Sequence, residues 1–265
     1  PGPVLIDVPK DVQVACCEYE PQPPTKPEPP KAAKEIRIKE AAGYINAARR
    51  PYIYFGGGLI TAGAQEQMLR LADAIDAPIG CSLMGISGIP TDHPRFLGMQ
   101  GMHGHYASSM AMHHADLIIS LGVRFNDRVT GNRQKFATGA KIVHIDVDGS
   151  ELSKTVSAVC GLRGDVRLTL DALLPLITAG EKPEWRAEVD GFRAKEDEYL
   201  DRREGMTPRK AIITLNRHLG ENTAVCTDVG QHQMWAAQNL SFRTPRRFVS
   251  SGGLGTMGFG LGAAI

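Results

Sequence analysis

The chain has 265 residues, of which 42% are hydrophobic and 22% charged, an ordinary globular composition that predicts one or two domains with a sizeable core. Thirty basic residues balance 29 acidic ones to a formal charge of +1, and no basic run carries interleaved aromatic residues, so the sequence argues against nucleic acid and anionic membranes as partners. No apolar run reaches the ~18 residues that span a bilayer.

The first twelve residues are predicted to form a strand, with Val-Leu-Ile-Asp-Val at 4–8 as its apolar part. Six prolines then fall at positions 21, 23, 24, 27, 29 and 30, a density that excludes helix and sheet and predicts an extended linker at a domain boundary. A proline opens the chain ahead of this strand, and the last five residues stop within a helical pattern. We therefore expect both ends to be cut, with a targeting peptide beyond them left open.

From residue 36 onwards, helices and strands alternate. Helices are predicted at 36–50, 64–75 and 108–114, and strands at 52–55, 78–82, 117–121 and 141–147. Apolar strands such as Leu-Ile-Ile-Ser-Leu indicate burial on both faces. The predicted fold class is therefore α/β, a doubly wound parallel sheet covered by helices on both sides.

The remaining elements form a second group. A helix is predicted from Asp165-Val166 to about 177, followed by a charged helix at 184–203 that reads as a solvated bridge. Thr207 as cap and Pro208 at the first helical position start another helix, which is expected to reach about 219. A new unit then follows, with a strand at 224–228, a helix at 232–239, a strand at 247–250 and a glycine-rich stretch at 252–262. We find no internal repeat.

The segment 98–131 places two polar loops around the strand at 116–121. Glycine, methionine and histidine precede the strand, whereas Arg124, Asn126, Asp127 and Arg128 follow it. Ligands of parallel sheets sit at the carboxyl ends of strands, and the arginine fork recognises carboxylates or phosphates. A surface ion pair between these side chains is an equal alternative on the residues alone.

Two further features follow strands. Gly56-Gly57-Gly58 lies between a strand and a helix, where the lack of side chains suits a pyrophosphate, although a plain tight turn explains it equally well. Asp146 ends the strand at 141–147, as does the acid that binds adenosine in dinucleotide folds. Asp148 is a competing candidate, and a capping aspartate is the commoner explanation.

Residues 253–258 match GxGxxG after a strand. The acidic residue expected about 20 positions on would lie beyond residue 265, so we reject NAD at this site. The upstream run Asp-Val-Gly-Gln-His-Gln-Met-Trp at 228–235 offers a strand end, a glycine and polar donors at a helix start, which suits a diphosphate. Together the two runs resemble the opening of the diphosphate-binding domain of thiamine diphosphate enzymes.

Histidines and cysteines give no metal site. His113 and His114 are adjacent on a predicted helix and point to different faces, and no carboxylate or cysteine stands at ligand spacing. The methionines at 99, 102, 110 and 112 read as adaptable core, with Met102 also placed to face a ligand. The cysteines lack CxxC spacing and indicate unpaired thiols in a reducing compartment, by default the cytoplasm; they are Cys16, Cys17, Cys81, Cys160 and Cys226.

Taken in order, these segments resemble the acetohydroxyacid synthases (acetolactate synthases), thiamine diphosphate enzymes that also carry FAD. The matching blocks are GPVLIDVPKDVQ at the start, GGG at 56–58, SLMG at 82–85, GMHG at 101–104, GVRFNDRVTG at 122–131, HIDVD at 144–148, GDV at 164–166, TDVGQHQMW at 227–235 and SGGLGTMGFG at 251–260. The resemblance covers essentially the whole chain. It implies a tail of the pyrimidine-binding domain at 1–15, a proline-rich linker at 16–32, a central FAD-binding domain at 33–180, a linker helix at 181–206 and the start of the thiamine diphosphate-binding domain at 207–265.

The resemblance also implies roles for individual residues. Arg128 resembles the arginine that holds a 2-ketoacid carboxylate, Gln231 and His232 resemble diphosphate contacts, and Gly255 and Met257 resemble the pair that holds the aminopyrimidine. Family variants carry aspartate where Asn126 stands and threonine where Ser82 stands, which weakens side-chain contacts there. The implied FAD contacts are Gly57, Ser82, Leu83, Met84, Gly85, Gly101, Met102, His103, Gly122, Val123, Arg124, Phe125, Asn126, Asp146, Val147, Asp165, Val166, Gly252 and Gly253.

The implied reaction of the full-length parent decarboxylates pyruvate on thiamine diphosphate and condenses the product with a second 2-ketoacid in branched-chain amino-acid biosynthesis. The pyrimidine-activating glutamate and the magnesium motif of the family are absent from these residues, so no catalytic or metal residue is assigned and the fragment alone is expected to be inactive. A homodimer or tetramer and a regulatory subunit are expected partners. The rivals are glyoxylate carboligase, pyruvate oxidase, a decarboxylase whose central domain binds ADP, and a plain nucleotide-binding module such as an electron-transfer flavoprotein subunit.

Overall fold

A six-stranded parallel sheet organises the protein, whose computed structural model describes residues 5–24, 28–199 and 204–265. The strand order is β3-β2-β1-β4-β5-β6, and every neighbouring pair is parallel. This confirms the predicted doubly wound α/β fold. The strands are β1 (Pro51–Phe55), β2 (Ile79–Cys81), β3 (Phe96–Met99), β4 (Leu117–Leu121), β5 (Lys141–Asp146) and β6 (Cys160–Arg163).

The order of the strands reverses between β1 and β4. Parallel sheets open a crevice at such a point, beyond the carboxyl ends of the strands. All five residues of β1 and all five of β4 are buried, and Ile53 pairs in register with Ile119. Helices cover both faces of these two central strands, which explains why almost all of their residues are apolar.

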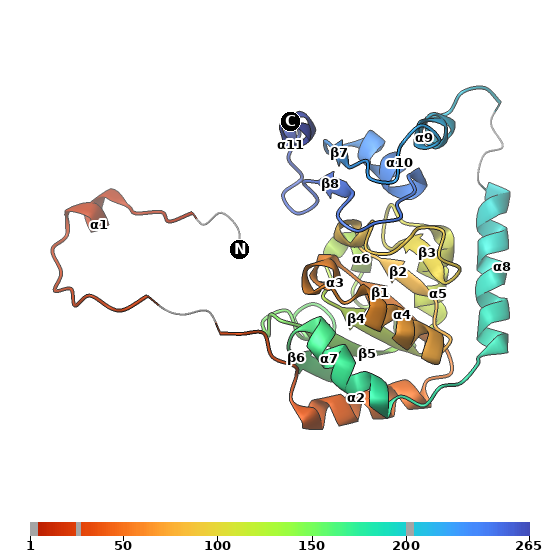
Figure 1. Ribbon diagram of the computed structural model, residues 1–265, viewed down its shortest axis with the longest axis horizontal. Helices are drawn as coiled ribbons and strands as arrows, with labels where there is room; N and C mark the ends of the chain where they lie inside the picture. Colours follow the sequence, from red (N-terminus) through yellow and green to blue (C-terminus); the bar gives the residue numbers. More distant parts are fainter. Residues whose placement is uncertain (1–4, 25–27, 200–203) are drawn as a thin grey trace.

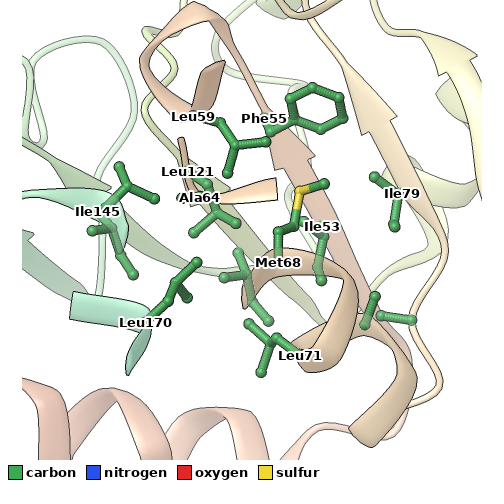
Figure 2. Packing of buried hydrophobic residues seen from close by; sticks show 14 of the residues in the cluster. Ile53, Phe55, Leu59, Ala64, Met68, Leu71, Ile79, Leu121, Ile145 and Leu170 are labelled. Carbon is green, nitrogen blue, oxygen red and sulfur yellow. The ribbon is translucent and has the colours of Figure 1, made fainter. Parts of the chain in front are cut away.

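Helices cover the sheet on both sides (Figure 1). The larger core lies on one side, where Ile53, Leu121 and Ile145 of the sheet meet Met68 and Leu170 of the helices (Figure 2). A second cluster around Tyr54, Met112 and Ile118 fills the other side. The first layer contains α2 (Glu35–Ala47), α3 (Gly57–Ala62), α4 (Gln65–Ala74), α7 (Val166–Leu173) and the 3-10 turn η2 (Leu174–Leu176), and the second contains α5 (Tyr106–His114) and α8 (Pro183–Tyr199).

The prediction that the charged helix at 184–203 is a solvated bridge is wrong for α8. Its residues Trp185, Val189 and Phe192 are buried, at the i, i+4 and i+7 positions of one face, and they pack in the second cluster. Its Glu196 carboxylate also accepts hydrogen bonds from the first backbone N–H groups of α5, each at 3.1 Å. The helix is therefore amphipathic, although its many charged residues suggested a fully solvated one. Residues 200–203 of the predicted helix lie outside the described residues.

The N-terminal strand prediction is also wrong over the described residues. Residues 5–9 form no regular element, α1 (Lys10–Val14) begins where the strand was expected to close, and Leu5 is 89% exposed. A strand needs a neighbouring strand to pair its backbone N–H and C=O groups. Residues 5–9 pair with no strand among the described residues. Residues 1–4 of the predicted strand lie outside the described residues. Residues 15–24 and 28–34 form neither helix nor strand, as the proline density predicts.

A second, smaller unit lies beside the carboxyl edge of the main sheet (Figure 1). Thr207 caps its first helix by accepting the N–H of Lys210, as predicted. Its two strands pair in parallel, and the main-chain N–H of Thr91 donates to Phe242, joining the unit to the central sheet at 2.9 Å. The unit contains α9 (Pro208–Asn216), β7 (Val225–Thr227), α10 (Gln231–Asn239), β8 (Phe248–Ser250) and α11 (Phe259–Ala264).

Besides the helix α1, the sequence interpretation missed two strands and three short helical elements. Strands β3 and β6 have four residues each and contain glycine, so their own sequence carries little strand signal. The 3-10 turn η1 (Leu83–Gly85) and the helices α3 and α6 (Asp127–Thr130) lie at the carboxyl edge of the sheet. None of the helices in the described part of the chain is long and apolar enough to cross a membrane.

Candidate functional site

A cavity of about 720 Å³ lies between the carboxyl edge of the main sheet and the second unit. The loops after β1, β2, β3 and β4 form one wall, and the start of α10 together with the glycine-rich stretch after β8 forms the other. This is the position that the reversal of strand order predicts for a ligand. Its volume lies within the range of small-molecule and cofactor sites, ~300–1,000 Å³.

The three glycines after β1 have different roles. A Cβ on Gly56 or on Gly58 would come within 2.7 Å of the backbone of Gly122, so these two allow the loops after β1 and β4 to touch. Gly122 itself has a φ of +54°, a left-handed conformation that favours glycine. Gly57 lines the cavity, as Gly56 also does, but a Cβ on Gly57 would meet only Met84, at 3.4 Å. The triple glycine is thus both a packing device and a site feature.

Positive charge enters the cavity from the loop after β4. Arg124 is exposed and forms no ion pair or side-chain hydrogen bond with the described residues. Among the same residues, the guanidinium of Arg128 pairs only with the carboxylate of its neighbour Asp127, with its Nη1 at 3.1 Å. Both members of this pair are about 70% exposed (69% and 72%), and such a pair is worth at most ~1 kcal/mol. Both guanidinium groups therefore remain able to bind an anionic ligand.

His144, on strand β5, supports this loop from within the sheet. The side chain is buried in the sheet, and its Nε2–H donates to the carbonyl of Val123 at 2.9 Å. Burial lowers the pKa of His144 below its ordinary value, so the ring is held neutral, with its proton on Nε2. Phe125 packs edge-on against this imidazole at 5.4 Å. The Arg124 loop is therefore anchored by two buried side chains.

Methionine supplies much of the apolar lining. Met84 and Met102 are 52% and 64% exposed, and both line the cavity with Met99 and Met234. Gly252 of the opposite wall packs on Met84, because a Cβ there would lie 2.7 Å from its sulfur. Thioethers adapt to flat aromatic ligands. The cavity therefore combines free cations, backbone turns and soft apolar surface, which suits an anionic ligand carrying a planar ring.

Most of the predicted site residues meet at this cavity. The structure brings together Gly57, Ser82, Leu83, Met84, Met102, His103, Gly122, Val123, Arg124, Asn126, Arg128, Gly252, Gly253 and Gly255.

The other predicted residues do not line the cavity. Asp146 accepts the N–H of Asp148 through its carboxylate, and Asp165 caps α7 by accepting the N–H of Leu168. Gly101 packs in the wall, where a Cβ would lie 2.7 Å from the carbonyl oxygen of Arg128. The remaining ones are Gly85, Phe125, Val147, Val166, Gln231, His232 and Met257, of which Phe125 and Val166 are buried and Val147 and Met257 are exposed.

Several lining residues were not predicted. Gln233 is buried and its Nε2 donates to the Ser250 hydroxyl; with Gly230 as the helix cap, positions 230, 233 and 234 share a face, and this i, i+3, i+4 spacing was a readable signal. Met99 and Gln100 were missed with β3. The others are Gly56, Asp127, Val129, Val229 and Gly230, with Met234, Ser251 and Leu254. No cluster of three or more histidine, cysteine, aspartate or glutamate side chains able to hold a metal ion occurs among the described residues.

The two segments of the chain that form the walls of this cavity each match a known protein family. The model of the thiamine pyrophosphate enzyme central domain matches residues 38–173, and that of the thiamine pyrophosphate enzyme C-terminal TPP binding domain matches residues 228–265. The large subunit of acetolactate synthase isozyme 3 from Escherichia coli is 40% identical over the whole chain, which covers 48% of that relative. A probable acetolactate synthase large subunit from Methanocaldococcus jannaschii is 41% identical, with the same coverage of both chains. The chain thus spans about half the length of these curated relatives.

Proposed function

The chain belongs to the thiamine pyrophosphate enzymes, and from this premise we propose that it is the middle part of an acetolactate synthase of branched-chain amino-acid biosynthesis. The substrates would be pyruvate and a second 2-ketoacid. The observation that carries the proposal is the meeting of the two walls: loops of the central sheet, with two available arginines, face the start of the diphosphate-binding unit across one cavity. Curated relatives named acetolactate synthase, about 40% identical along the whole chain, support it.

The proposed domain organisation follows the sequence interpretation. Residues 33–180 would be the central FAD-binding domain and 207–265 the start of the thiamine diphosphate-binding domain. Residues 1–15, 16–32 and 181–206 would be the pyrimidine-domain tail, the linker and the linker helix.

The wall formed by the central sheet fits FAD. Gly57 leaves room beside the turn after β1, the free guanidinium of Arg124 would pair with a phosphate, and Met84 and Met102 offer soft surface to a ring. The predicted contacts outside the cavity, such as Asp146 and Asp165, would require an extended cofactor that continues beyond it.

The second unit fits a thiamine diphosphate. Gly230 has a φ of +157° and caps α10, which leaves backbone N–H groups at the helix start able to face a diphosphate. Gln231 and His232 would add donors, and Gly255 and Met257 would hold the aminopyrimidine. Magnesium would accompany the diphosphate.

Thiamine diphosphate, when bound, supplies the electron sink that makes decarboxylation of a 2-ketoacid possible. The chain would contribute binding and orientation. Arg128 would hold the carboxylate of the ketoacid by a two-point contact, while the methionines would offer apolar surface to the ligand. His144, through the carbonyl of Val123, would keep the arginine loop in place during the reaction.

We also propose an assembly for the full-length protein. Relatives named large subunits support a second, regulatory subunit for this protein as well. We further propose a homodimer or tetramer in the cytoplasm, without a nucleic-acid or membrane partner, which fits the formal charge of +1.

The test is acetolactate formation by the full-length protein that contains this chain. With thiamine diphosphate, magnesium and FAD added, pyruvate should give acetolactate, and omission of any one of them should lower the rate. Glyoxylate as sole substrate separates the glyoxylate carboligase alternative, and oxygen consumption separates pyruvate oxidase. Arg124→Ala should lower flavin content. Product from glyoxylate but not from pyruvate would overturn the proposal.

A further inference from the structure

His105 connects the two walls of the cavity from behind. It precedes α5 and does not itself line the cavity. Its ring Nδ1 accepts the backbone N–H of Met99 at 3.1 Å, and its Nε2–H donates to the backbone carbonyl of Gln238 in α10 at 3.0 Å. Only the neutral ring with its proton on Nε2 makes both hydrogen bonds, since the Nδ1 atom must accept.

Further hydrogen bonds hold Gln238 of α10 and the loop between β3 and α5 in place around His105. The side-chain Nε2 of Gln238 donates to the carbonyl of His103 at 2.7 Å, so Gln238 is held through its backbone and its side chain. The backbone N–H of His105 also donates to the carbonyl of Met99 at 2.8 Å. Gly98 has a φ of +86°, and a Cβ there would lie 2.2 Å from the imidazole of His105. The ring is therefore seated in a gap that the backbone leaves for it.

The two ends of this bridge lead directly into the cavity. On one side, Met99 and Met102 line the wall of the central sheet; on the other, Gln233 and Met234 line the wall of α10, one to two helical turns before Gln238. The separation of these walls decides how a ligand contacting both of them fits. Other direct contacts between the units are the hydrogen bonds of Thr91 with Phe242, those that Ser87 accepts from the N–H groups of Arg247 and Phe248, and the packing of Gly252 on Met84.

We propose that His105 is a positioning residue that fixes the spacing between the two walls of the cavity, and through it the affinity of the enzyme for its thiamine cofactor. The cofactor part of this inference rests on the proposed function; the bridge itself rests on the hydrogen bonds alone. Loss of two neutral hydrogen bonds should weaken thiamine diphosphate binding by roughly five- to fiftyfold, with little change in kcat once the site is saturated.

The experiment compares His105→Phe with His105→Gln in the full-length enzyme. Phenylalanine keeps a planar ring but neither hydrogen bond, whereas glutamine keeps one acceptor and one donor. Hydrogen–deuterium exchange should quicken in residues 96–105 and 231–240 of the phenylalanine variant and stay at the native rate in β4 and β5. The half-saturating concentration of thiamine diphosphate should rise in parallel, and glutamine should restore part of both. His218→Phe, on an exposed histidine just after α9, is the matched control and should change neither quantity.

Equal quickening of exchange in β4 and β5 would show that the ring only stabilises the fold, and would overturn the proposal. So would native exchange at both segments, or a fall in kcat with an unchanged half-saturating concentration. If the native enzyme shows no response to thiamine diphosphate, the proposed function fails, and the exchange pattern still decides whether His105 joins the two walls.

Discussion

Asp76 holds helix α8 to the central sheet, and its removal should cost a large part of the stability. The carboxylate is 2% exposed and lies 2.6 Å from both Arg95 and Arg186, and it accepts the backbone N–H of Lys182 at 2.7 Å. Burial alone would raise the pKa of Asp76, but the hydrogen bonds from Arg186, Arg95 and Lys182 lower it to about 2, against an ordinary value of 3.8. At 1.36 kcal/mol per unit, this shift corresponds to about 2 kcal/mol of stability at neutral pH.

The appropriate perturbation is Asp76→Asn. Asp76 has a φ of +53°, a conformation that asparagine tolerates better than alanine does, so the substitution removes the charge without adding backbone strain. We expect a loss of ~2–3 kcal/mol in the free energy of unfolding, because an amide N–H₂ would also face an arginine. Denaturant unfolding can be followed by the fluorescence of Trp185, which is buried on α8. Asp73→Asn is the control: among the described residues its 64% exposed carboxylate forms an ion pair with Arg95 alone, and the substitution should cost under ~1 kcal/mol.

The pH dependence gives a second check on the same reasoning. A carboxyl group with a lowered folded-state pKa stabilises the protein fully above its ordinary value of 3.8, and this contribution is lost as the pH falls towards about 2. The difference between native protein and Asp76→Asn should therefore shrink below pH 4. Equal losses for Asp76→Asn and Asp73→Asn, or a difference that persists to pH 2, would refute an electrostatic clamp.

Three further predictions concern the loop after β4. Arg128→Ala in the full-length enzyme should lower kcat/KM for acetolactate formation roughly ten- to more than a hundredfold, the value of a charge-assisted hydrogen bond of ~1.5–3 kcal/mol, while flavin content stays native; lysine should recover only part. Gly122→Ala should cost more than ~2 kcal/mol in denaturant unfolding, because its Cβ would lie 2.6 Å from the backbone of Gly58. His144 has a lowered pKa, so its contribution to stability is complete above pH 6.5 and declines as the pH falls below that value; His144→Gln should flatten this part of the stability profile between pH 7.5 and 5.

A different outcome would contradict each of these three predictions. Near-normal turnover with lost flavin would make Arg128 a cofactor residue. Gly131 has a φ of +52° and open space around it, so Gly131→Ala carries the strain without the collision; equal losses for the two glycines would remove the packing argument. Parallel pH profiles for native protein and His144→Gln would show that another group titrates.

The local sequence determined those elements whose signal is carried by neighbouring residues. The apolar runs of β1, β4 and β5 and the cap at Thr207 were sufficient for their prediction, because burial on two faces and capping leave a mark within a few positions. The loop that carries Arg124 and Arg128 was found for the same reason, since it directly follows a buried strand. The family resemblance then assigned roles to residues of that loop, among them Arg128, that the residues alone left open.

Only the tertiary structure decided what depends on distant partners. Strands β3 and β6 form because a neighbouring strand pairs with them, α8 is buried because α5 lies beside it, and residues 5–9 form no strand because no partner is present in the described chain. The same applies around the cavity: Gly56 and Gly58 allow the contact with Gly122, Gly57 lines the cavity, and His105 finds its acceptor 133 positions away. Such contacts join segments that are far apart in the sequence, and the local residue pattern of one segment does not depend on the other. A single sequence therefore does not reveal them.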